Sequence, residues 1–226
     1  MKKLNRQEWA LLLIILVYSF IPAVGGLFRI FEFAGGPAIA PGNPRALASP
    51  APIILHILSS SLFLLLGAVQ FLPGIRRHSP AIHRTLGPAV VVSGCISAAT
   101  GVWMTHFYTF PSELQGVLLY WARIFLGLSM IGLIVCSVVA IRSRNISLHG
   151  ASMFRAYAIG QGASTQAFMG IGWMILSGTE ALGPVREGIM LSAWILNFLA
   201  AEYLIGKFLM PKNLPVETKS LPSGDH

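Results

Sequence analysis

Residues 117–141 read VLLYWARIFLGLSMIGLIVCSVVAI, an apolar run with one charged side chain, Arg123. A helix of about 20 apolar residues crosses a hydrocarbon core of about 30 Å, so this run predicts a transmembrane helix. Apolar and polar residues do not alternate with a period of two, which argues against a barrel strand. Similar runs recur along the chain, and we expect six spans at about residues 9–30, 53–72, 86–105, 117–141, 153–176 and 189–209.

The composition points to the same class of protein. Of the 226 residues, 54% are hydrophobic and 11% are charged, and the mean hydropathy is +0.70. A soluble domain has about 25% charged residues, so an ordinary soluble domain and a disordered chain are both excluded. We predict an all-α polytopic membrane protein in contact with the lipid bilayer, with one transmembrane domain over residues 1–210 and a short cytoplasmic tail over residues 211–226.

The net charge of +8 is distributed unevenly between the two sides of the membrane. Most of the 16 Lys and Arg residues fall at the N-terminus, in the loops from even to odd spans, or in the tail. This positive-inside pattern places both termini in the cytoplasm, as an even number of spans requires, and it argues against a nucleic-acid partner. The four exceptions are Arg29, Arg45, Arg123 and Arg186.

A short internal repeat involves two of the predicted inner loops. Residues 75–83 align without gaps with residues 141–149, an offset of 66 residues that also aligns Gly94 with Gly160. Both loops join an inward-going span to an outward-going one, so the repeat is parallel and pairs spans two and three with spans four and five. We therefore expect a four-helix core with a pseudo-twofold axis.

Histidines on facing helices are typical of a haem site, because two imidazoles can bind the iron from opposite faces of the macrocycle. By the symmetry of the repeat, we expect His83 and His149 to be the axial iron ligands of one haem b near the cytoplasmic leaflet. Arg84 and Arg155 would lie near its propionates. Ionisable groups in a membrane are costly, which makes these residues candidates for function.

His56 and His106 are a second candidate pair of cofactor ligands, toward the outer side. His83 and His106 are about 35 Å apart on one predicted helix, so they belong to separate sites. A histidine at a helix end also fits a simpler interpretation, an interfacial anchor that contacts lipid phosphates. Met153, one helical turn after His149, leaves copper as another metal to consider.

Residues 160–166 read GQGASTQ, which is unusually small and polar for the middle of a span. Such a segment indicates either close helix packing with interhelical hydrogen bonds or the wall of a pocket for a quinone-like or lipid-like molecule. Arg123 or Glu202 could line the same cavity. The candidate pocket residues are Gln70, Gln161, Thr165 and Gln166.

Several segments carry a resemblance to a known family. HRTLG at residues 83–87, RAYAIGQGASTQ at 155–166, LHI at 55–57 and the pair Gln70-Phe71 are similar to a bacterial family of predicted membrane proteins, domain-of-unknown-function family 2306. The resemblance covers roughly residues 52–173. It implies a multi-pass protein of the bacterial cytoplasmic (inner) membrane and no particular activity.

A more distant likeness, in topology only, is to two-haem transmembrane cytochromes b that ascorbate reduces. In those proteins spans two and four hold one haem, and spans three and five hold the other. The likeness implies that His83 and His149, on spans three and five, share a haem. His56 is on span two, but span four has no histidine.

Our first functional hypothesis is a haem b-binding electron-transfer protein, a membrane oxidoreductase component if it is an enzyme, with a quinone or another redox partner. A carrier or small-ligand-binding membrane protein is the alternative, and a non-catalytic membrane subunit is a third. The sequence contains none of the soluble catalytic signatures GxSxG, HExxH, P-loop or CxxC.

Overall fold

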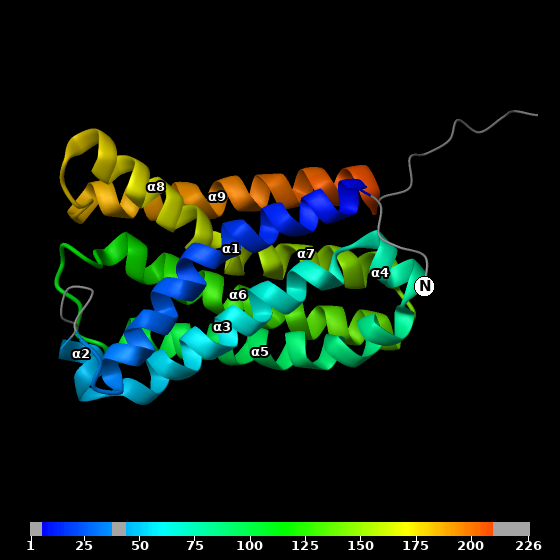
Figure 1. Ribbon diagram of the computed structural model, residues 1–226, viewed down its shortest axis with the longest axis horizontal. Coiled ribbons are helices and arrows are strands. Elements are labelled where there is room, and N and C mark those ends of the chain that lie inside the picture. The colour runs from blue at the N-terminus through cyan, green and yellow to red at the C-terminus, as the bar shows by residue number, and fades with distance from the viewer. Residues whose placement is uncertain (1–5, 38–43, 210–226) are drawn as a thin grey trace, which may run out of the picture.

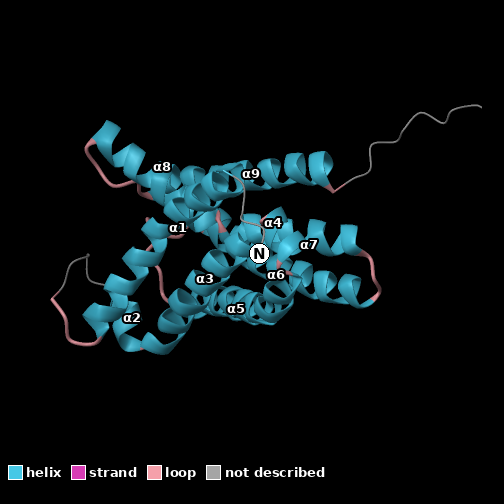
Figure 2. Ribbon diagram, turned by 45° about the vertical axis from the view of Figure 1, so that its right-hand side comes forward, coloured by secondary structure: helices cyan, strands magenta, loops and turns pink. Residues whose placement is uncertain are grey.

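The computed structural model describes residues 6–37 and 44–209, and these residues form helices and no strand (Figures 1 and 2). The predicted tail over residues 211–226 lies outside the described residues. The helices are α1 (Arg6–Phe33), α2 (Pro44–Ala48), α3 (Pro50–Gln70), α4 (Pro73–His78), α5 (Pro80–Phe107), α6 (Val117–Arg142), α7 (Ile146–Gly160), α8 (Gly162–Ser177) and α9 (Gly183–Phe208).

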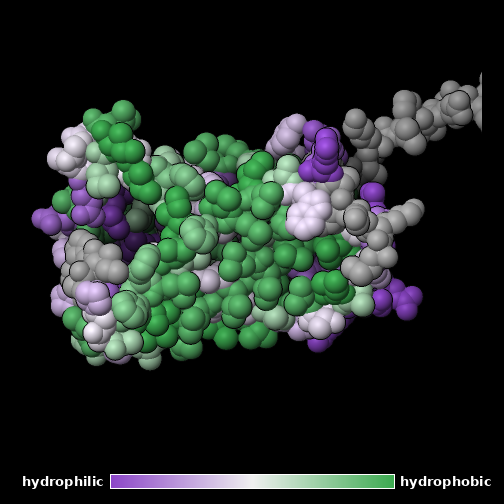
Figure 3. All heavy atoms as spheres, viewed as in Figure 1, coloured by the Kyte–Doolittle hydropathy of each residue, from purple (hydrophilic) through white to green (hydrophobic). Residues whose placement is uncertain are grey.

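Five of these helices, α1, α3, α5, α6 and α9, are long and apolar enough to cross a membrane. Exposed apolar side chains cover much of the surface between the two ends of the bundle (Figure 3). A soluble protein would bury such side chains, whereas hydrocarbon solvates them. The chain is therefore an all-helical integral membrane protein.

Local sequence explains where several helices begin. A proline in the first turn starts α3, α4, α5 and α9, where its missing N–H has no intrahelical partner to lose. At the start of α7 the Asn145 side chain accepts a hydrogen bond of 3.0 Å from the backbone N–H of Leu148. These signals divide the apolar runs into separate helices with short turns.

The segment predicted as one span over residues 153–176 is divided between α7 and α8 at Gln161. The break leaves backbone carbonyls at the end of α7 without intrahelical donors. Two side chains of α9 supply donors: Trp194 Nε1 to the carbonyl oxygen of Ile159 at 3.2 Å, and Asn197 Nδ2 to that of Ala158 at 3.3 Å. Hydrogen bonds from α9 thus provide donors for backbone carbonyls at the helix break, and unpaired carbonyls would be energetically costly in lipid.

The core lies between α3, α5, α6 and α7, where Phe63 is 1% exposed and Ile134 is fully buried. A Cβ atom at Gly94 or at Gly160 would lie within 2.8 Å of opposite edges of the Phe63 ring, so only glycine permits this close approach. Helix α3 packs against α5 and α6 against α7, while α1 and α9 flank the group.

The bundle has two ends, which we name after their short helices (Figure 1). The α4 end carries α4 and the turn between α6 and α7, and the described parts of α1 and α9 begin and end there. The α2 end carries α2, the connection between α5 and α6, and the turn between α8 and α9.

Candidate ligand-binding cavity and histidine site

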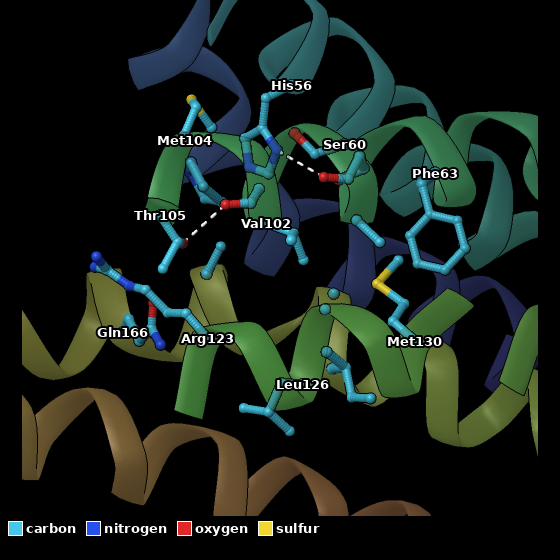
Figure 4. A pocket seen from close by; sticks show the side chains of 18 of the residues that line it. His56, Ser60, Phe63, Val102, Met104, Thr105, Arg123, Leu126, Met130 and Gln166 are labelled. Atoms are coloured by element: carbon cyan, nitrogen blue, oxygen red, sulfur yellow. Dashed lines mark hydrogen bonds between the residues drawn. The ribbon is translucent and has the colours of Figure 1, made fainter. Parts of the chain in front are cut away.

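A cavity of about 390 Å³ lies inside the bundle toward the α2 end (Figure 4). This volume is within the range of about 300–1,000 Å³ that is usual for small-molecule sites. Helices α3, α5 and α6 supply most of the wall, with contributions from α1, α7, α8 and α9. Its polar lining includes His56, Ser60, Thr105, Arg123 and Gln166, and its apolar lining includes Phe63, Val102, Leu126 and Met130.

His56 points from α3 into the cavity (Figure 4). Its Nδ1 lies 2.9 Å from the carbonyl oxygen of Ser97 and 3.2 Å from Thr100 Oγ1. Because a carbonyl oxygen can only accept, Nδ1 carries the proton and Nε2 is the acceptor. Gly101 lies against the ring, since a Cβ atom there would be 3.4 Å from Cε1. The imidazole is therefore held in a defined orientation and tautomer by α5.

Arg123 extends from α6 toward Gln166 and Thr105 (Figure 4). Its Nη1 donates to Gln115 Oε1 at 2.5 Å, and its Nη2 donates to Met190 Sδ at 3.4 Å. The guanidinium also lies over the Phe110 ring, 5.5 Å from the centroid. Among the described residues, no carboxylate oxygen lies within 4.0 Å of this guanidinium. The described groups that contact the guanidinium are therefore neutral.

Tyr108 closes one side of the cavity where α5 ends. Its hydroxyl donates to the carbonyl oxygen of Ser49 at 2.6 Å, which joins the end of α5 to the start of α3. Burial raises the pKa of the Tyr108 phenol, so the group stays neutral and acts as a donor. Hydrophilic residues surround a hollow at this end of the molecule (Figure 3).

The predicted pocket residues are placed in three different settings. Gln166 lines the cavity and donates from Nε2 to the carbonyl oxygen of Met190 at 3.2 Å. Gln161 instead bonds Ser19, Tyr157 and Ser164 between helices, and Thr165 bonds Asn197 at 2.7 Å and also Tyr18. Gln70 is near the α4 end, and its side-chain amide is buried without a hydrogen-bond partner. Only Gln166 belongs to the cavity wall.

His83 and His149 lie at the α4 end, near the starts of α5 and α7. His149 Nδ1 lies 2.7 Å from Ser137 Oγ and 3.1 Å from the Ser137 carbonyl oxygen, which leaves Nε2 as the free nitrogen. His83 Nδ1 is buried and has no hydrogen-bond partner. No group of three or more His, Cys, Asp or Glu side chains in the described part of the chain could hold a metal ion.

The remaining predicted site residues have other contacts. Arg84 is exposed and donates to the carbonyl oxygen of Pro80 at 3.4 Å. Arg155 forms a two-pronged ion pair with Glu202, at 2.5 and 2.8 Å, which links α7 to α9. His106 is exposed, with Nδ1 3.0 Å from Tyr120 Oη, and it is not part of the cavity wall. The structure does not bring His106 and His56 into one cavity.

Two short patterns could have identified wall residues that the sequence reasoning missed. Ser97, Gly101 and Thr105 recur every four residues on α5, and His56 and Ser60 have the same spacing on α3. Residues four apart lie on one face of a helix. A polar or small stripe at this spacing within an apolar run is therefore a usable signal for a membrane-embedded cavity.

Comparison with known proteins gives one match. A family model described as "Predicted membrane protein (DUF2306)" matches residues 53–205, which include most of the cavity wall and the two histidines His83 and His149. No curated protein and no solved structure matches the chain. Because the match covers more than half of the chain, from α3 to near the end of α9, this integral membrane protein belongs to the DUF2306 family.

Proposed function

We propose that this protein binds a small lipophilic molecule, quinone-like or lipid-like, in the cavity at the α2 end. The main observation behind the proposal is that one cavity has two kinds of lining. Polar groups lie around Arg123 and His56, and apolar side chains lie around Phe63 and Met130. Ligand sites commonly combine an apolar lining with a few polar groups that orient the ligand. Both a carrier and a ligand-binding protein would have a site of this kind.

The proposed topology has six spans, in which α7 and α8 cross the membrane together as one discontinuous helix. Two observations support it: α7 and α8 follow one another along the bundle (Figure 1), and residues on both sides of the break line the cavity. Discontinuous helices form binding sites in many transporters. In the proposed orientation the α4 end faces the cytoplasm of a bacterial cell, and the positive-inside rule supports it because basic residues gather there. They include Arg76, Arg77, Arg84, Arg142 and Arg144.

A parallel repeat of two helices is part of the same proposal. Gly94 and Gly160, which the 66-residue offset aligns, contact opposite edges of one ring, that of Phe63. Equivalent positions of the two repeats would approach each other near the pseudo-twofold axis. This contact supports a four-helix core built from α3 with α5 and α6 with α7.

Ligand binding can be measured through Trp194, which lines the cavity. We suggest titrating the purified chain in neutral detergent with three probes: an ω-brominated dodecanol, the matching dodecanoate, and a decyl-substituted benzoquinone. Each probe quenches tryptophan at short range. We expect saturable quenching by at least one probe, and we expect Trp194→Phe to remove the saturable component while the other tryptophans still show weak, linear quenching.

Ser60→Leu should abolish saturable binding, because a larger apolar side chain would fill the polar end of the cavity. Within the described part of the chain, the Ser60 hydroxyl donates to the carbonyl oxygen of Ile57 on the same helix and joins no two helices, so folding should be retained. Leu58→Phe, on an exposed face of α3, is the matched control and should bind normally. Unsaturable quenching by all three probes in the wild-type protein would contradict the proposed function.

A second candidate function is electron transfer through haem b at the α4 end. Two observations support this candidate: His83 and His149 both lie near the starts of their helices at the α4 end, and Ser137 orients His149 with Nε2 free. The Nδ1 atom of His83 is buried and has no hydrogen-bond partner among the described residues, which is unusual for a buried polar atom. Arg84 is exposed and could pair with a haem propionate, whereas Arg155 already forms an ion pair with Glu202. Haem b bound there would accept and donate single electrons.

Absorption spectroscopy tests this second function independently of the cavity. The protein purified from haem-sufficient cells should show a bis-imidazole haem spectrum, and His83→Ala or His149→Ala should remove it. His78→Ala, in α4, is the control that should leave the spectrum unchanged. A colourless wild-type protein, or a spectrum insensitive to both substitutions, would contradict haem binding at these histidines.

A further inference from the structure

We infer that the ligand of the cavity is a single-chain amphiphile with an anionic head group, a carboxylate or a phosphate, which Arg123 binds. This inference rests on the proposed function and adds the chemical class of the ligand. It starts from an imbalance of charge: Arg123 is a cation inside a membrane-spanning helix, and no described carboxylate lies within 4.0 Å of it.

Neutral partners do not remove the cost of this charge. Two of the five N–H donors of the guanidinium are used, by Gln115 Oε1 and Met190 Sδ. Burying an ion without a counter-ion is costly, and ionisable side chains within a membrane are usually paired. An anionic head group would complete the site, since arginine binds carboxylate and phosphate through two parallel hydrogen bonds.

The charged groups around Arg123 do not neutralise it. Arg45 lies over the same Phe110 ring, 4.8 Å from its centroid, and Arg186 is close enough to Arg123 to act on it electrostatically. The carboxylates of this end have other partners or are exposed. Glu187 accepts from the backbone N–H of Leu119 at 3.1 Å, Glu180 lies 3.7 Å from Arg186, Glu32 pairs with Arg29, and Glu113 is exposed.

The shape of the cavity indicates one hydrocarbon chain behind the head group. On α6 the wall continues from Arg123 through Leu126 and Gly127 to Met130, residues that share one face of the helix. These positions span about 10 Å along the helix axis. The lining becomes apolar toward Met130, where Phe63 and Ile159 also contribute. A volume of about 390 Å³ is at the lower end for a ligand site, which favours one chain over two.

The test compares head groups on one chain length at alkaline pH, where the carboxylate is ionised. We expect ω-bromododecanoate to bind the wild-type protein about ten- to one-hundred-fold more tightly than ω-bromododecanol, as expected for hydrogen bonds between charged groups. Competition with dodecyl phosphate and with inorganic phosphate separates an amphiphile from a free anion. Displacement by inorganic phosphate alone, at a concentration equal to that of dodecyl phosphate, would overturn the amphiphile.

Variants at Arg123 assign the preference to its charge. Arg123→Gln should reduce dodecanoate affinity to that of dodecanol and leave dodecanol affinity unchanged, whereas Arg123→Lys should keep most of the preference. Arg142→Gln, an exposed arginine at the other end, is the matched control. If Arg123→Gln does not fold, the ratio of dodecanoate affinity to dodecanol affinity, measured for the wild-type protein and for Arg123→Lys, still tests the inference.

The possible outcomes distinguish this inference from the proposed function. Equal affinity for the alcohol and the carboxylate would overturn the anionic head group and leave the lipophilic site intact. If Arg123→Gln keeps the wild-type preference for the carboxylate, Arg123 does not bind the head group, and the inference is overturned at that residue. Saturable binding by neither probe nor by the benzoquinone would overturn both. A preference for the carboxylate that depends on Arg123 supports both.

Discussion

Replacing Phe63 with alanine should lower the free energy of unfolding by about 3–5 kcal/mol, the usual cost of removing a buried aromatic side chain. Phe63 is 1% exposed, and its ring centroid lies 5.7 Å from that of Tyr157. Its closest neighbours include Gly94 and Gly160, which have no side chains that could move into the space. The cavity left behind should therefore persist, and the loss should fall at the upper part of this range.

Unfolding can be followed by far-UV circular dichroism while SDS is titrated into protein in neutral detergent micelles. The matched control is Leu62→Ala, since Leu62 is the adjacent residue of α3 and is 52% exposed. Lipid or detergent can replace its contacts, so we expect a much smaller change. An equal loss of stability in the two variants would show that the Phe63 ring does not fill a closely packed core.

Gln161→Leu should produce the second large loss of stability. The Gln161 side chain donates to Ser19 Oγ at 2.9 Å and accepts from Ser164 Oγ at 2.8 Å, and both serines are fully buried. Leucine would leave both hydroxyls without these partners, at a cost of about 1–3 kcal/mol for each. Tyr157 should be affected less, because its hydroxyl also donates to the carbonyl oxygen of Leu64 at 2.8 Å.

Gln166→Leu is the comparison that separates stability from binding. The Gln166 side chain donates to the carbonyl oxygen of Met190 and lines the cavity. The same SDS titration should therefore show a small loss for Gln166→Leu, and probe titration should show weaker binding. Gln161→Leu should show the reverse pattern. If Gln161→Leu is as stable as the wild-type protein, the hydrogen bonds at the helix break do not stabilise the fold.

The long helices were predictable because hydropathy is local. The predicted spans at about residues 9–30, 53–72, 86–105 and 117–141 fall largely within α1, α3, α5 and α6, and each has enough apolar surface to favour hydrocarbon by itself. The break at Gln161 was not predicted, although glycine stands on both sides of it. Its stability depends on Trp194 and Asn197, which lie more than thirty residues away in the chain.

The cavity was predictable only in part. Its cation and one of its histidines stand out in the sequence, because Arg123 and His56 are polar residues inside apolar runs. The sequence could not distinguish the two glutamines of residues 160–166, since the break changes the face that each one presents. Gln166 lines the cavity, whereas Gln161 joins helices.

Hydropathy along the chain by itself determined that this is a helical membrane protein, because the free energy of moving apolar surface into lipid adds up residue by residue. Tertiary structure alone decided which charges are compensated: Glu202 neutralises Arg155, while the hydrogen-bond partners of Arg123 among the described residues are the neutral Gln115 and Met190. A counter-ion or hydrogen-bond partner comes from a distant part of the chain, so its presence depends on how the helices pack and not on local composition.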